Sequence, residues 1–196
     1  MATSAQPPVA ARTMVEFVEL AGLGDDAKTA LQPSHGPREY LQALIAKALH
    51  PDAVRFLAHA LPKREGIWWA WVCARRASGD APPPAIAAAL AATEKWISQP
   101  TDENRRAAMT AAQAADFSTP AGCTALAVFL SGGSMGPPDT PAVPPGEFLT
   151  ARAITGAIVA AAVSTDPAKA PDKFQSFIAQ GLDVVNRLHL WAGGAA

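Results

Sequence analysis

The strongest constraint on the fold is an uncharged segment from Ile67 to Ala74, which holds three of the five tryptophans in this 196-residue chain. On a helix, at about 100° per residue, the indoles of Trp68, Trp69 and Trp71 spread over roughly 160° of the circumference. Small and aliphatic side chains fill the remainder. A helix that is apolar on every side is typical of the middle of a protein, so we predict a central tryptophan-rich helix.

The rest of the chain also predicts helices. Apolar residues recur at helical spacing in the stretches 14–21, 41–48, 54–61 and 174–188, and an alternating strand pattern is confined to at most one short run. Prolines and glycines divide these stretches into eight to ten helices. No repeat of fixed length is present, which disfavours a regular solenoid. We therefore predict an all-α fold, an irregular multi-helix bundle around the tryptophan-rich helix.

One domain is expected. Residues 1–12 hold two prolines and little that could be buried, so they predict a flexible N-terminal leader. Residues 13–192 predict a single helical domain, and 193–196 a flexible tail. Within the domain, 132–146 contains five prolines and four glycines and predicts a long irregular loop.

Charge and composition exclude several classes of function. The net charge is −1, and the 17% of charged residues are spread along the chain, so nucleic acid is not an expected partner. The first residues lack the basic and apolar regions of a secretory signal, and the apolar run at 153–163 is too short to cross a bilayer. Cys73 and Cys123 lack metal-ligand spacing and predict buried reduced thiols. We expect a cytoplasmic protein without membrane insertion, and the alanine- and proline-rich composition favours a bacterial origin.

The sequence Gly-Gly-Ser-Met-Gly at 132–136 matches the Gly-x-Ser-x-Gly turn of serine hydrolases, where the serine projects from a strand-to-helix elbow. Pro137 and Pro138 follow directly, at the point where a hydrolase needs a helix whose amides support the oxyanion hole. The strands of a supporting sheet are also missing from the pattern. A hydrolase using Ser134 is therefore the least favoured function.

Two other kinds of site are weakly indicated. The glycines at 132–136 could cradle a phosphate, but no lysine or arginine lies between Ser118 and Thr150. His50 and His59 could bind a metal, but His59 falls on the polar face of its predicted helix, which favours surface histidines. We therefore expect no metal and no cofactor.

Lys63 and Arg64 stand at the start of the tryptophan-rich helix, where the helix dipole disfavours positive charge. Either both side chains extend into water, or they mark the binding site of an anionic partner.

Several segments together resemble a bacterial family known only as a domain of unknown function. They are the Trp-Trp-x-x-x-Cys helix within 61–75, Glu-Lys-Trp-Ile at 94–97, Glu-Asn-Arg-Arg-Ala-Ala at 103–108, and Ser-Gly-Gly-Ser at 131–134 before a proline-rich loop. The resemblance covers most of 13–190. It implies a link to secretion or signalling operons, but no activity and no catalytic residue.

The leading hypothesis is a non-enzymatic protein–protein interaction module, an adaptor or accessory subunit of a bacterial multiprotein assembly. Its interaction loop would present Met135, Pro137, Pro138, Val143 and Pro144. The alternative is a domain that binds a small molecule or a peptide in a pocket walled by Trp68 and Trp71, with Arg64 or Arg75 as the anion anchor. The partner and the oligomeric state are not indicated.

Overall fold

The computed structural model describes residues 13–137 and 139–191, and this part of the chain is all-helical, as predicted. Its elements are α1 (Met14–Ala21), α2 (Asp25–Ala30), α3 (Pro37–Ala46), α4 (His50–Ala60), α5 (Lys63–Ser78), α6 (Pro84–Ser98), α7 (Asp102–Ala115), α8 (Pro120–Phe129), α9 (Leu149–Val163), the 3-10 helix η2 (Pro167–Lys169) and α10 (Ala170–Arg187). The all-α class and the multi-helix bundle are confirmed. The predicted leader at 1–12 and tail at 193–196 lie outside the described residues.

Several helices begin at residues that favour a helix start. Thr13 and Glu16 form a capping box at α1. Thr101 and Thr119 each accept a hydrogen bond from an amide in the first turn of α7 and α8. Prolines occupy the first turn of α3, α4, α6 and α8, where their missing N–H costs no hydrogen bond. Among the helices of the described residues, none combines the length and the apolar character needed to cross a bilayer.

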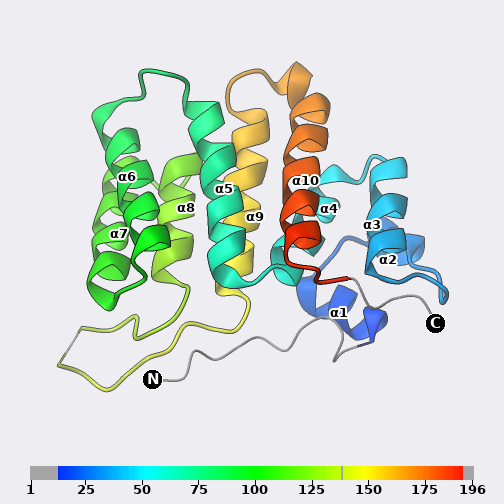
Figure 1. The fold of residues 1–196 in the computed structure, drawn as a ribbon, viewed down its shortest axis with the longest axis horizontal. Coiled ribbons are helices and arrows are strands. Elements are labelled where there is room, and N and C mark those ends of the chain that lie inside the picture. Colours follow the sequence, from blue (N-terminus) through cyan, green and yellow to red (C-terminus); the bar gives the residue numbers. More distant parts are fainter. Residues whose placement is uncertain (1–12, 138, 192–196) are drawn as a thin grey trace.

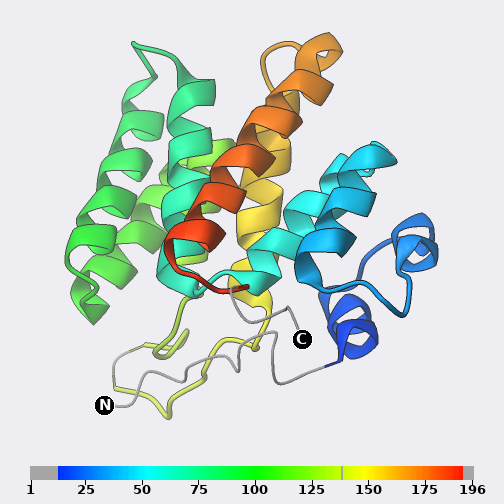
Figure 2. The same cartoon turned by 45° about the vertical axis from the view of Figure 1, so that its right-hand side comes forward.

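The middle of the bundle is occupied by α9, which packs against α4, α5, α8 and α10 (Figure 1). On one side of it, α6, α7 and α8 pack on one another, while α1, α2 and α3 lie at the other end of the molecule. Figure 2 shows α10 crossing in front of α9, beside α5. The connection from α8 to α9 runs along one end of the bundle.

The tryptophan-rich helix α5 packs against α6, α8, α9 and α10, but it is not covered on every side. Its buried face consists of Gly66, Ile67, Trp69, Ala70, Cys73 and Ala74. On the opposite face, Trp68 is 37% exposed, and Trp71 and Val72 are half-buried. The expectation that all three tryptophans are interior was therefore wrong for Trp68, because α6 and α10 flank α5 and leave a strip of it facing solvent.

Trp69 makes the closest contact between α5 and α10. Its side chain is fully buried, and its Nε1 donates a hydrogen bond to the carbonyl oxygen of Phe177 at 2.7 Å. A Cβ at Gly181 would lie 2.8 Å from two atoms of the indole ring, so only glycine fits at this position without a shift of the ring. A hydrogen-bonded indole against a bare stretch of backbone thus fixes how α10 lies on α5.

Both histidines of α4 are buried, which corrects the prediction of surface histidines. His50 stacks on Phe174 of α10, with ring centres 5.9 Å apart. His59 is 5% exposed, lies 5.6 Å from the ring of Phe148, and places its Nδ1 2.8 Å from the carbonyl oxygen of Arg55. His59 is buried although it lies on the polar face of its helix, because α9 packs over this side of α4.

Protonation of His59 should destabilise the fold. Burial lowers the pKa of His59 below its ordinary value of 6.5, and its Nε2 has no hydrogen-bond partner among the residues that the structure describes. Because the unfolded chain binds this proton more readily, the contribution of His59 to stability is present above about pH 6.5 and is lost as the pH falls below it. We expect the free energy of unfolding, measured with urea between about pH 5 and 8, to fall less steeply toward acid in His59→Phe than in the unaltered protein. Parallel curves for the two proteins would contradict this.

Candidate functional site

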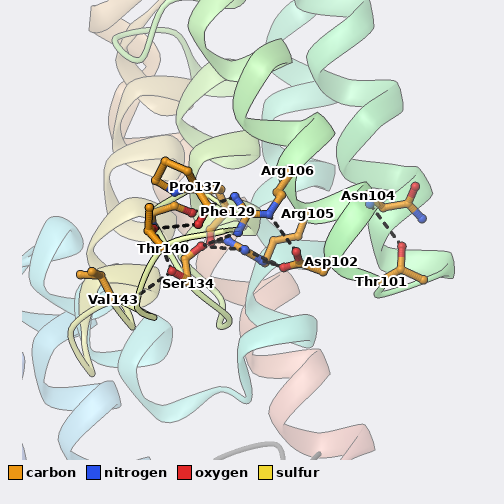
Figure 3. Close-up of polar contacts among 11 residues, drawn as sticks. Thr101, Asp102, Asn104, Arg105, Arg106, Phe129, Ser134, Pro137, Thr140 and Val143 are labelled. Carbon is orange, nitrogen blue, oxygen red and sulfur yellow. Dashed lines mark hydrogen bonds and ion pairs between the residues drawn. The ribbon is translucent and has the colours of Figure 1, made fainter.

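The proline-rich connection between α8 and α9, here named the anchored loop (residues 131–148), is held by two arginines of α7. Arg105 donates to the carbonyl oxygens of Phe129 and Ser134, both within 2.9 Å. Arg106 donates to the carbonyl oxygens of Gly136 at 3.0 Å and of Ser134 at 3.3 Å. Figure 3 shows both guanidinium groups pointing from α7 into the loop.

Asp102, in the first turn of α7, holds the two arginines in place. Its carboxylate accepts from Arg105 Nε and from Arg106 Nε, each at 2.8 Å (Figure 3). Hydrogen bonds from Arg106 and then from Arg105 hold the pKa of Asp102 below its usual value. Arg105 is only 4% exposed, and its guanidinium lies 4.8 Å from the ring centre of Phe129. Asp102 thus supports a buried cation whose other donors bind the end of α8 and the loop.

Ser134 is the centre of the hydrogen bonds inside the anchored loop. Its Oγ accepts from the amides of Gly136 at 3.1 Å and Val143 at 3.0 Å, and the amide of Met135 donates to the carbonyl oxygen of Val143 at 2.8 Å. Gly133 has φ +64°, and a Cβ there would lie 2.9 Å from Arg105 Nη2. The Gly-x-Ser-x-Gly sequence therefore forms a turn that fits around Arg105, with the serine hydroxyl accepting bonds from the loop backbone.

The outer surface of the anchored loop presents the predicted interaction residues to solvent. Met135 is 37% exposed and Val143 is 50% exposed, although both contribute backbone groups to the hydrogen bonds of the loop. Pro137 and Pro144 are also exposed. Pro138 lies outside the described residues. The loop thus combines fixed backbone with apolar side chains that face water.

The residues of the predicted pocket do not form one site. Trp71 and Arg75 line a depression of about 420 Å³, and the guanidinium of Arg75 lies 5.3 Å from the indole centre of Trp71. Trp68 lines a second depression of about 170 Å³ between α5 and α10. Arg64 belongs to neither, because its Nε donates to the carbonyl oxygen of Ile97 at 2.8 Å.

The two cations at the start of α5 have structural partners. Arg64 binds a carbonyl in the last turn of α6, and Lys63 Nζ donates to the carbonyl oxygen of Ser131 at 3.0 Å, just beyond α8. Burial lowers the pKa of Lys63. Both side chains therefore satisfy carbonyls at the C-terminal ends of other helices, where positive charge is favourable. Lys63 is half-buried and does not simply extend into water, whereas Arg64 is exposed although it binds a carbonyl.

The role of Arg105 and Arg106 was not predicted from the sequence, because only cations within the loop itself were considered. The signal was the spacing of Asp102 with Arg105 and Arg106, three and four residues further along one helix face. That spacing predicts the acid–base cluster, but not the segment of chain against which the cluster packs.

Comparison with known proteins gave one match. A model for the Family of unknown function (DUF6931) matches residues 40–185, a range that includes α5, the arginine cluster of α7 and the anchored loop. Searches of curated proteins and of solved structures found no match.

Proposed function

We propose that this chain, which belongs to the Family of unknown function (DUF6931), is a non-enzymatic protein–protein interaction module that binds its partner through the anchored loop. In this role it is an adaptor or accessory subunit of a cytoplasmic bacterial assembly, of the kind used in secretion or signalling.

The observation that carries the proposal has two parts. Arginines of α7 hold the backbone of the loop, and apolar side chains of the loop face solvent. Arg105 and Arg106 bind the carbonyls of Ser134 and Gly136, and the Ser134 hydroxyl ties Val143 to the same turn. Arg105 donates to the loop carbonyl of Ser134 as well as to Asp102 and to Phe129 of α8. A buried arginine is an energetically costly way to hold a surface loop, since its charge has to be desolvated. Its presence is explained if the shape of the loop is needed.

A preorganised loop also favours binding energetically. Ordering a free loop on binding costs about 0.5–1.5 kcal/mol for each immobilised side chain, and fixed backbone avoids part of that cost. The prolines at 137, 141, 144 and 145 restrict the backbone further. Met135 and Val143 then supply apolar contact area, with exposed prolines around them. The same geometry supports a structural rather than a nucleophilic role for Ser134, whose Oγ accepts two backbone amides.

The test is a double substitution, Met135→Ser with Val143→Ser, at two side chains that are 37% and 50% exposed. Because neither side chain is buried, we expect the stability to change by less than about 0.5 kcal/mol each. Partners captured by the tagged protein from host lysate should be lost with the double variant. With the purified partner, calorimetry should show affinity at least about tenfold weaker, or 1.4 kcal/mol.

Val163→Ser is the matched control. Val163 is 42% exposed, but it ends α9 at the opposite end from the loop, about 20 Å along the helix. Equal loss of binding in the control, or full binding by the loop variant, would reject the anchored loop as the contact surface.

A further inference from the structure

The uncovered strip of α5 has a regular spacing. Its outward positions are Glu65, Trp68, Val72 and Arg75, with Gly79 just beyond the helix, and they follow one another at steps of three, four, three and four. Residues at this spacing lie along one line of a helix and can pack against a second helix over several turns. The strip therefore has the layout of a helix–helix contact surface.

The surface of the strip has a partly exposed ring, Trp68, beside a small depression on one side of Val72, and a larger depression on the other side. Trp68 is 37% exposed and lies one turn before Val72. The depression of about 420 Å³ lies on the other side, lined by Trp71, Val72, Arg75 and Arg76 together with Gly79 and Asp80. It is open to solvent, which fits a side chain from another protein surface better than an enclosed small ligand.

The charges around the strip are balanced. Arg75, Arg76 and Arg187 are matched by Glu65, Asp80 and Asp183. A strongly acidic or strongly basic partner would meet like charge here, whereas a surface carrying both signs can pair with itself. Within the described part of the chain Glu65 takes part in no ion pair, so its carboxylate is free to bind an outside cation.

We propose that a second copy of this chain covers the strip, with the two α5 helices antiparallel about a twofold axis at Val72. In such a pair, a residue four positions before Val72 faces one four positions after it. Trp68 therefore faces Arg76 of the second copy and lies beside Arg75 of that copy. The exposed part of the Trp68 indole of each chain contacts the larger depression of the other.

The arginines gain specific contacts in this arrangement. Arg75 already stacks on Trp71 at 5.3 Å, and its opposite face is available to Trp68 of the second copy. Glu65, seven residues before Val72, comes within one helical turn of Arg76 of the second copy. Arg76 remains able to bind it, because among the described residues only its Nη1 is used, in a 2.8 Å hydrogen bond to Ser176 Oγ. Each contact occurs twice, as twofold symmetry requires.

Sedimentation of the full chain tests the pairing. At about 100 µM we expect a mass approaching twice the 20.3 kDa of one chain, falling on dilution. Trp68→Ala should weaken the dimer at least about tenfold, while Val163→Ala, at a position 42% exposed on α9, should leave it unchanged. A monomer at this concentration, or a dimer unaffected by Trp68→Ala, would overturn the proposal.

A charge exchange tests the register. Glu65→Arg and Arg76→Glu should each give monomers, because each variant places like charges opposite one another at both ends of the interface. Mixed in equal amounts, the two variants should form a heterodimer in which both pairs are again of opposite charge. If the mixture stays monomeric although each variant keeps the helical circular dichroism of the unaltered protein, the antiparallel register is wrong. The anchored loop is unaltered in these variants, so the result is independent of the function proposed for it.

Discussion

Trp69→Ala should lower the free energy of unfolding by about 3–5 kcal/mol, the range for removing a large aromatic side chain from a core. Trp69 is fully buried, and its Nε1 donates to the carbonyl oxygen of Phe177. Its ring also lies against the bare backbone of Gly181, so its removal leaves a cavity at the contact between α5 and α10. Loss of the hydrogen bond to the carbonyl oxygen of Phe177, an interior residue of α10, adds to the cost.

Trp68→Ala provides the matched comparison on the neighbouring residue. Trp68 is 37% exposed, and its indole makes no hydrogen bond within the described part of the chain, so we expect a loss of about 1–2 kcal/mol. Urea unfolding at low protein concentration, where self-association does not contribute, measures both values. Equal losses would mean that the indole of Trp68 is as well packed as that of Trp69, contrary to the burial described above.

Trp68 and Trp69 show which part of the packing could not be predicted from the sequence. Apolar side chains around the whole circumference of α5 predicted a helix within a bundle, which is the case. Because apolar residues surround this helix, it has no single apolar face that would indicate which tryptophan is buried. The small partner that selects Trp69 is Gly181, more than a hundred residues away, and no local pattern connects the two.

Helix caps are easier to infer from a sequence, because a capping side chain bonds to residues close to it in the chain. Thr101 and Thr119 satisfy amides within three residues, so their role can be inferred from the sequence around them. His59 is the opposite case. Its helix has polar residues on that side, but α9 covers the histidine, so burial was decided by tertiary packing.

The candidate site was predicted in part for the same reason. Its exposed apolar residues are adjacent in the sequence and could be named, but Arg105 lies about thirty residues before Ser134, whose carbonyl it binds. A search for cations inside the loop found none. The spacing of Asp102, Arg105 and Arg106 can be recognised in the sequence, but such a spacing ordinarily indicates an exposed ion pair on one helix.

Arg105→Ala should therefore destabilise the fold as well as release the loop. The substitution removes the donors to the carbonyl oxygens of Phe129 and Ser134 in a site where Arg105 is only 4% exposed. The carbonyl oxygen of Phe129 loses its donor, while that of Ser134 keeps the longer bond from Arg106 at 3.3 Å. At about 1–3 kcal/mol for a buried group left without a partner, and with the packing of the guanidinium on the ring of Phe129 also lost, we expect a loss of roughly 2–4 kcal/mol. Arg105→Lys should recover little of it, since an ammonium cannot reproduce the planar fork that reaches the two carbonyls and Asp102.

Hydrogen exchange distinguishes loss of the loop from general destabilisation. The amides of Met135 and Val143 are both hydrogen-bonded within the loop, so their exchange should accelerate in Arg105→Ala more than that of amides in α9. Arg106→Ala, at a side chain that is 28% exposed, should cost about 1 kcal/mol or less. Uniform acceleration across the chain would contradict a specific anchoring role.

The same variant connects the anchor to the proposed function. A buried guanidinium cannot touch a partner, so any effect of Arg105→Ala on binding has to act through the shape of the loop. If the partner recognises that shape, affinity should fall in Arg105→Ala under conditions where the protein is still folded, although Met135 and Val143 remain in place. Undiminished affinity would show that the exposed side chains suffice without the fixed backbone, and the buried arginine would then serve only to join α7 to α8.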